Sequence, residues 1–92
     1  MIPDPVQWHV AEHAMHQSFD DQAVVLDLAG GAYFRLNRTA ARAWERLKSG
    51  ATVDQLADAL AREFEVERAV LRADMEALVL DLSSRGLVRE GP

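Results

Sequence analysis

The chain of 92 residues contains no cysteine and only three prolines, and none of its apolar runs approaches the ~20 residues that a membrane span needs. The absence of cysteine excludes disulfides, thiolate metal sites and cysteine nucleophiles, and it is compatible with a reducing cytoplasm. The first residues lack the pattern of a signal peptide. Hydrophobic residues make up 49% and charged residues 27%, which is typical of a globular protein. We therefore expect one small cytoplasmic domain over residues 1–92.

Positive charge is also scarce, because 15 acidic residues outnumber ten lysines and arginines and leave a net charge of −5. The excess lies in the C-terminal half, where residues 51–92 carry nine acids and five bases. Nucleic acid is therefore a poor expected partner, and a neutral or basic ligand suits the chain better. Since a deep catalytic pocket usually needs a longer chain, the composition favours a binding module over an enzyme.

The N-terminal third has the apolar alternation of β-strands. This period predicts strands over residues 6–11, 23–28 and 32–36, and the polar stretch 17–22 is typical of a turn. Gly30-Gly31 predicts a tight hairpin between the last two strands, because glycine adopts the positive φ that such turns need. The residues expected to face the core in the last two strands are Leu26, Phe34 and Leu36.

From Asn37 onward the apolar period is that of helices. It predicts three helices, over about residues 37–50, 52–64 and 68–85. Asn37 or Thr39 can cap the first helix, and Thr52 with Gln55 has the form of a capping box for the second. With a short strand at 87–89, the order predicts an α+β fold with a winged helix-turn-helix arrangement. The expected buried stripes are Ala40, Ala43, Trp44 and Leu47; Val53, Leu56, Ala57, Leu60 and Phe64; and Leu71, Met75, Leu78 and Leu82.

Few side chains suggest chemistry. His9, His13 and His16 would be well spaced for zinc on a helix, but they fall in strand and turn, so we expect solvated histidines and no metal site. Gly30-Gly31 lacks the following helix and the lysine of a phosphate-binding loop. No Ser/His/Asp arrangement is indicated. The sequence therefore predicts neither an enzyme nor a bound cofactor.

Charge on the helices limits the possible partners. Arg38, Arg42 and Arg46 recur every four residues, which indicates either a solvated face or a docking patch for an acidic partner. A winged helix could also bind DNA, but residues 67–85 carry four acids against three arginines and contain no Asn or Gln to read adenine. A DNA-binding regulator is therefore the disfavoured alternative.

The third predicted helix carries a second stripe beside its core line. Val70, Asp74, Ala77 and Asp81 have the spacing i, i+4, i+7, i+11 and form one row. A row of small residues leaves a shallow groove, and its carboxylates could hold a basic side chain. The alternative interpretation is a wide core face with ordinary surface acids.

Several segments together resemble one family. They are residues 25–37, with the pattern Leu-Asp-Leu, a glycine turn and Tyr-Phe-x-Leu-Asn, then 40–47, 50–53, Asp74-Met75 with Leu78 and Leu82, and 85–88. Their order and spacing are similar to the PqqD-like family of peptide-recognition proteins, and most similar to the stand-alone members from lasso-peptide gene clusters. The resemblance covers about residues 22–90, and the first 21 residues depart from the pattern.

The resemblance implies both a fold and a function. The fold is a three-stranded antiparallel sheet packed on a trihelical winged-helix bundle. The function is to bind the leader segment of a ribosomally made precursor peptide, which adds as a strand to the edge of residues 32–36 and places side chains in a groove beside the third helix. The peptide-binding residues so implied are Ala32, Tyr33, Phe34, Arg35, Leu36, Val70, Ala73, Asp74, Ala77 and Asp81.

The implied partners are the precursor peptide and the processing enzyme that receives it. In lasso clusters this enzyme is a separate cysteine protease that removes the leader, and the cyclase is a further candidate partner. Neither nucleic acid nor a membrane is expected. The alternative pathways are another peptide modification or the synthesis of pyrroloquinoline quinone.

Overall fold

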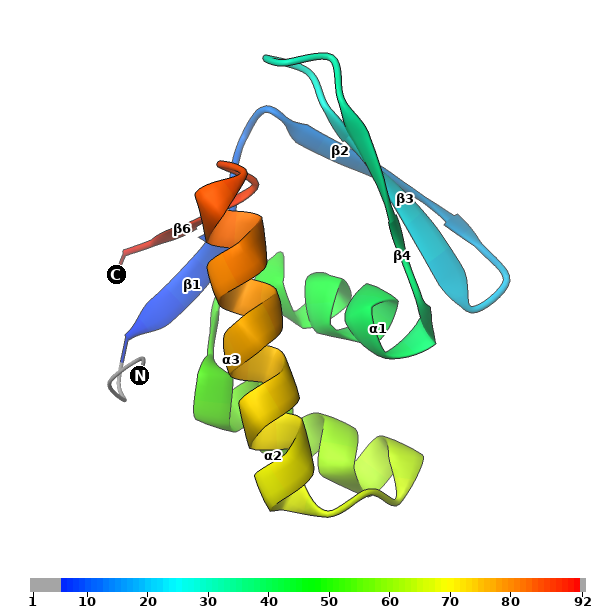
Figure 1. Cartoon of the computed structure of the whole chain (residues 1–92), viewed down its shortest axis with the longest axis vertical. Helices are drawn as coiled ribbons and strands as arrows, with labels where there is room; N and C mark the ends of the chain where they lie inside the picture. The colour runs from blue at the N-terminus through cyan, green and yellow to red at the C-terminus, as the bar shows by residue number, and fades with distance from the viewer. Residues whose placement is uncertain (1–5, 92) are drawn as a thin grey trace.

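The computed structural model describes residues 6–91, which form two small sheets and three helices (Figure 1). The α+β fold expected from the sequence is confirmed. Among the described residues, no helix combines the length and the hydropathy needed to cross a bilayer. The strands are β1 Gln7–Val10, β2 Ala14–Phe19, β3 Gln22–Asp27, β4 Tyr33–Leu36, β5 Ala51–Thr52 and β6 Val88–Glu90, and the helices are α1 Arg38–Leu47, α2 Val53–Phe64 and α3 Arg68–Ser84.

The larger sheet is antiparallel and has the order β2-β3-β4. Asp20 adopts a positive φ of 55° in the short turn between β2 and β3. The predicted hairpin joins β3 to β4, where Gly31 has a φ of 77° and the Asp27 Oδ1 accepts hydrogen bonds from the backbone N–H groups of Ala29 and Gly30. In this order β2 and β4 are the two edge strands.

The smaller sheet has the order β5-β1-β6 and joins both ends of the described chain to the start of α2. Two predictions were therefore wrong. The first predicted strand lies in this smaller sheet, and the stretch 17–22, predicted to be a turn, is mostly strand. The polar residues of this stretch look like a turn because β2 is an edge strand and most of its residues are exposed. Such a strand needs few apolar side chains.

The orientation of β3 also differs from the prediction. Ala23 and Val25 are buried, whereas Leu26 is 39% exposed and points to the other face. The run Ala23–Leu26 is apolar on both faces, so its period cannot say which face is inside. Packing of α1 against β3 decides this, and Val25 pairs with Phe34 on the inner face.

The helices begin and end largely as their residues predict. The Asn37 Oδ1 caps α1 by accepting from the Ala40 N–H, and the capping box of Thr52 and Gln55 opens α2. The predicted core stripes are confirmed except at three half-buried residues, Ala40, Phe64 and Leu78. Val79 is fully buried on α3 in place of Leu78. Trp44 of α1 is 1% exposed and lies at the centre of the core.

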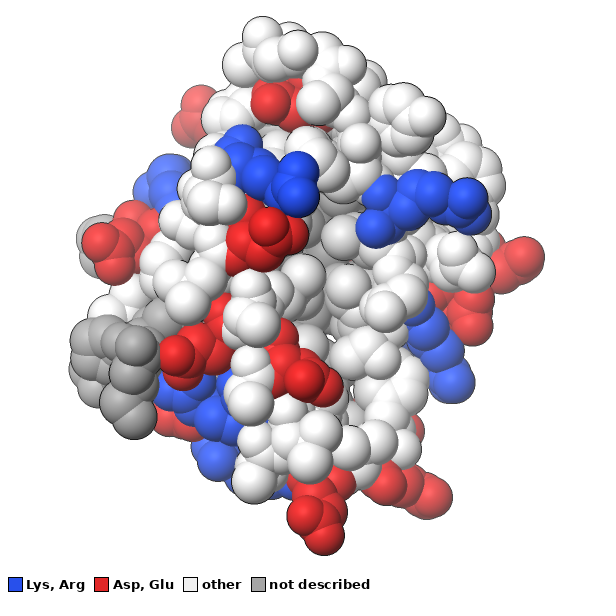
Figure 2. Space-filling model, in the orientation of Figure 1, with Lys and Arg blue, Asp and Glu red and all other residues white. Residues whose placement is uncertain are grey.

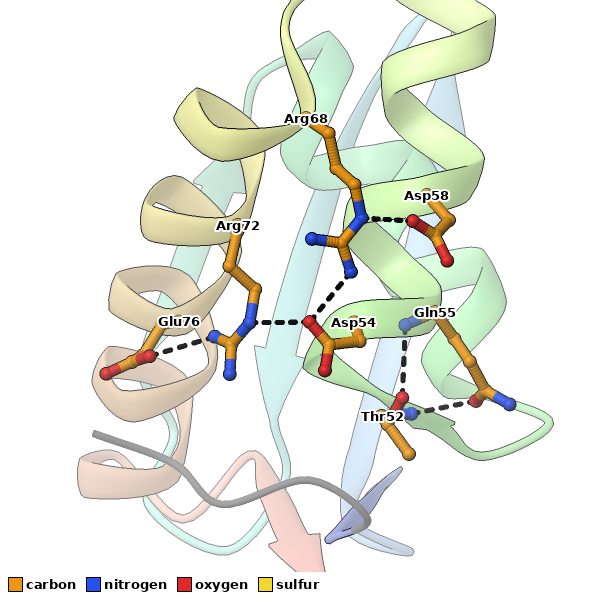
Figure 3. Close-up of polar contacts among 7 residues, drawn as sticks. All are labelled: Thr52, Asp54, Gln55, Asp58, Arg68, Arg72 and Glu76. Atoms are coloured by element: carbon orange, nitrogen blue, oxygen red, sulfur yellow. Dashed lines mark hydrogen bonds and ion pairs between the residues drawn. The ribbon is translucent and has the colours of Figure 1, made fainter.

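Ion pairs join α2 to the first half of α3 (Figure 3). The carboxylate of Asp54 accepts from Arg68 at 2.9 Å and from Arg72 at 2.7 Å. Arg68 also pairs with Asp58, and Arg72 with Glu76 at 2.8 Å. The hydrogen bond from Arg68, together with the charge of Arg72, lowers the pKa of Asp54 below its ordinary value of 3.8. This network fixes the direction that α3 takes after the α2–α3 turn.

Replacing the cap of α2 should destabilise the domain. We expect Thr52→Ala to lower the free energy of unfolding by about 1 kcal/mol, because the Gln55 N–H loses its acceptor and the capping box opens. Urea unfolding followed by circular dichroism measures this. Thr39→Ala is the matched control and should change stability by less than about 0.5 kcal/mol, since Asn37 supplies the cap of α1. Equal losses in both variants would contradict the assignment of the caps.

The stabilisation from Asp54 should depend on pH. A carboxyl whose pKa is lowered by folding adds stability above its unfolded pKa, and this is lost as the pH falls through the folded value. Wild type should therefore exceed Asp54→Asn in stability at neutral pH, and the two should converge below the ordinary pKa of 3.8. Urea midpoints across pH test this. Profiles that stayed parallel down to acid pH would contradict a stabilising role of the Asp54 carboxylate.

Candidate functional site

One edge of β4 is not paired with any described strand. The Asp27 N–H donates to the carbonyl of Ala32 at 2.8 Å, so the backbone groups of Ala32 point toward β3. Backbone direction alternates along an antiparallel pair, so Phe34 and Leu36 also bond to β3. The N–H and C=O groups of Tyr33 and Arg35 are therefore directed outward. These four groups can pair with a further strand.

A groove of about 390 Å³ lies between this edge and α3. Figure 2 shows that this face of the molecule is hollowed, with mostly uncharged atoms inside and charged side chains at its rim. Half-buried or buried apolar side chains form the floor, so an apolar side chain of a ligand would lose water on entering. The floor residues are Phe34, Leu36, Ala40, Leu78 and Leu82, and Tyr33, Arg35, Asn37, Asp81 and Arg85 complete the lining.

Asp81 of α3 and Arg85, the residue that caps the end of this helix, form part of the rim. The guanidinium of Arg85 lies 4.6 Å from the centre of the Phe34 ring, which is a cation–π contact between α3 and β4. The Arg85 Nε also donates to the Asp81 Oδ1 at 3.2 Å. The carboxylate of Asp81 thus already accepts from the arginine that follows its helix, and it is less available to a basic ligand than the sequence suggested.

The predicted site residues fall into two groups. Residues 33–36 and Asp81 line the groove, and Ala32 lies just before β4. The other four are exposed on α3 but are not part of the groove lining: Val70, Ala73, Asp74 and Ala77. By helical spacing, the row that contains Val70 continues from Asp81 toward the start of α3, about 16 Å away at 1.5 Å per residue.

Several lining residues could not be recognised as such from the sequence. Ala40, Leu78 and Leu82 were assigned to the core because an apolar side chain at helical spacing fits a core and a groove floor equally well. Asn37 was recognised only as a cap. Arg85 gave one usable signal, its i+4 spacing from Asp81, which is typical of an ion pair at the helix end.

The three histidines do not come together, and all three are partly buried. His9 packs on Gly50, where an added Cβ would lie 2.5 Å from the His9 ring. His13 lies 3.8 Å from the Asp27 carboxylate. His16 is half-buried beside Trp44, with its Nε2 3.2 Å from Glu45. Within residues 6–91, no group of three or more potential ligands is placed to hold a metal ion.

Partners within the chain neutralise much of the arginine row on α1. Arg42 pairs with Glu63 at 2.5 Å, and that hydrogen bond raises the pKa of Arg42. Arg38 lies over the Phe64 ring and 3.9 Å from Asp21. These contacts favour the interpretation as an ordinary polar face over a docking patch for an acidic partner.

A small α+β domain with an unpaired strand edge beside a helix groove has the form of a module that binds an extended peptide. The chain belongs to the PqqD family, because the family model described as "Coenzyme PQQ synthesis protein D (PqqD)" matches residues 22–88. This confirms the resemblance inferred from the sequence. A search of curated proteins found no match.

Two solved structures share the fold. A structure titled "TbiB1 in Complex with the TbiA(beta) Leader Peptide" superposes with a TM-score of 0.81 at 26% identity, over 88% of this chain and 94% of that one. Another, titled "Lasso peptide synthetase B1 complexed with the leader peptide", has a TM-score of 0.78 and 33% identity, over 89% and 96%. Both titles name a protein bound to a leader peptide.

Proposed function

We propose that this protein binds the leader segment of a ribosomally made precursor peptide in lasso-peptide biosynthesis and presents the precursor to the enzyme that removes the leader. The observation that carries the proposal is the outward-directed edge of β4 beside the groove on α3. Similarity to two proteins whose titles describe leader complexes, one at 33% identity over most of both chains, supports the pathway.

The leader pairs as a fourth strand with Tyr33 and Arg35. Backbone hydrogen bonds supply affinity for any extended segment, and alternate side chains of the leader enter the groove and supply specificity. The floor of Phe34, Leu78 and Leu82 suits an aromatic residue or a leucine. Beyond the groove, the leader follows the row of small and acidic residues on α3, where Asp74 meets a basic residue.

The protein acts as an adaptor and catalyses no step. It needs no cofactor, because its work is to hold one peptide in an extended form and to raise its concentration near an enzyme. Ribosomes make the precursor peptide that this protein binds, so we assign this role to the cytoplasm.

One observation favours a second pathway. The matching family model takes its description from the synthesis of coenzyme PQQ, so the same adaptor role in that pathway is the alternative. Titration with leader peptides from the two kinds of precursor separates the proposals, since groove specificity should favour one by at least about tenfold. The leader of a lasso-peptide precursor is the first peptide to test.

Strand addition is tested most directly at Arg35. We expect Arg35→Pro to weaken leader binding by at least about tenfold, or about 1.4 kcal/mol, because proline removes an outward N–H and its ring blocks the edge. Proline is tolerated at a strand edge when the lost N–H faces outward, so the fold should persist. Fluorescence anisotropy of a labelled leader measures affinity, and circular dichroism checks the fold.

The matched control is Arg35→Ala, which removes the same side chain and keeps the N–H. It should bind the leader within about threefold of wild type. If folded Arg35→Pro also binds normally, the leader does not add to β4. If both variants lose binding equally, the side chain rather than the backbone makes the contact.

The row on α3 is tested with a second pair. We expect Val70→Glu to weaken leader binding by over about tenfold, because the bound leader would cover the new charge where it follows the helix. Val66→Glu adds the same charge at a similarly exposed valine in the α2–α3 turn and should leave affinity unchanged. Anisotropy titrations of both variants would contradict the path along α3 if they gave equal affinities.

A further inference from the structure

The second edge of the larger sheet, formed by β2, is also unpaired within residues 6–91. The Leu28 N–H donates to the carbonyl of His13 at 2.8 Å, so the backbone of His13 is directed toward β3. Because the direction alternates along the strand, the backbone groups of Ala14, His16 and Ser18 point outward. The Ala14 N–H is already bonded within the preceding turn. The N–H and C=O groups of His16 and Ser18 can therefore pair with a further strand.

β2 lacks the features that usually protect an edge strand. Its six residues include no proline and no lysine, arginine or acid, whereas β4 has only four residues, one of them Arg35. α1 packs chiefly against β3 and β4, and in Figure 1 the turn between β2 and β3 projects past α1. Ser18 lines a hollow of about 500 Å³ between this turn and α1, so there is room beneath the end of β2. An edge of this kind favours pairing with another chain.

The sequence of β2 is complementary to itself. Gln17 has a polar residue on each side, His16 and Ser18, and beyond these lie two exposed apolar residues. These are Met15 and Phe19, with exposed fractions of 55% and 52%. If two copies paired antiparallel about Gln17, Met15 of each copy would lie opposite Phe19 of the other. Since opposite residues point to the same face, both apolar pairs would form on the outer side of the sheet.

The direction of the backbone groups agrees with this register. His16 of one copy lies opposite Ser18 of the other, and these are the residues whose N–H and C=O groups point outward, so each such pair exchanges two hydrogen bonds. Met15 and Phe19 then occupy non-hydrogen-bonded positions, where side chains approach most closely. A register centred on His16 would instead place Met15 opposite Gln17 and would lose the apolar pairs.

Charge gives this edge a distinctive salt dependence. Each copy carries a net charge of −5, so two copies repel each other at a distance. β2 contains no acid, lysine or arginine, so no like charges meet across the paired strands. Because salt screens the long-range repulsion and leaves an uncharged contact intact, raised salt should strengthen the association. An association driven by opposite charges would weaken instead.

We propose that β2 pairs with β2 of a second copy, antiparallel and in the register centred on Gln17. The two larger sheets then form one sheet of order β4-β3-β2-β2-β3-β4, in which both β4 edges stay free. Paired strands of this length bury less than the roughly 1,200 Å² of a standard stable interface, so we expect a Kd on the order of 100 µM. The inference does not depend on the proposed function, because the leader is assigned to the opposite edge.

The absence of cysteine from the chain permits a direct test of the register. Gln17 would face its own copy at a non-hydrogen-bonded position, where a Cα separation of about 4.5 Å suits a disulfide. We expect Gln17→Cys to form a disulfide-linked dimer under mild oxidation, seen on non-reducing gels. The matched control is Gln22→Cys, an equally exposed glutamine on β3 of the same hairpin. It should cross-link at least about tenfold more slowly, because its counterpart lies beyond the reach of a disulfide.

Sedimentation of the cysteine-free protein tests the edge itself. Ser18→Pro removes an outward N–H and should raise the Kd of the dimer at least about tenfold, whereas Ser18→Ala keeps the N–H and should dimerise as wild type does. Circular dichroism checks the fold. Gln17→Lys provides a second variant if the proline variant does not fold. It places like charges opposite each other and should raise the Kd about threefold or more.

The outcomes are distinct. A wild-type protein that stays monomeric up to about 1 mM overturns the proposal. Unchanged dimerisation of folded Ser18→Pro, or of Gln17→Lys if that is the folded one, also overturns it and assigns the dimer to another surface. Equal cross-linking of the two cysteine variants overturns the register centred on Gln17. All these variants should bind the leader as wild type does, and failure of wild type to bind it overturns the proposed function alone.

Discussion

The packing of α1 beneath the larger sheet is the contact on which the rest of the structure depends. Trp44 and Leu47 are almost wholly buried, and α1 touches β1, β3, β4 and α2. Because one helix joins both sheets to the helical bundle, its position decides which face of the sheet is inside. The same position leaves the edge of β4 and the outer sheet face uncovered.

An unpaired strand edge usually promotes aggregation, but the unpaired edge of β4 is short and has a helix beside it. β4 is only four residues long, and α3 stands beside it with Arg85 reaching over Phe34. A short edge flanked by a helix offers room for one extended peptide and obstructs the open-ended pairing that leads to aggregation. The ion pairs of Asp54 with Arg68 and Arg72 join the first half of α3 to α2.

Much of the fold could be predicted from local patterns. The caps at Asn37 and Thr52, the hairpin at Gly31 and the three helices follow from residue type and spacing, because these features are decided within a few residues. The sequence failed where the choice was between two equivalent faces or partners. Val25 and Leu26 are both apolar, and β2 is polar enough to look like a turn, so only packing could assign them.

The candidate site, like the fold, could be predicted from the sequence only in part. The sequence by itself determined that residues 33–36 form a strand and that small and acidic residues share one line on α3, since period fixes both. Tertiary structure decided that the groove floor includes Ala40, Leu78 and Leu82, and that Asp81 is shared with Arg85. It also decided that Leu26 faces outward. These facts depend on which surfaces meet across residues far apart in the chain, and a local pattern carries no information about such contacts.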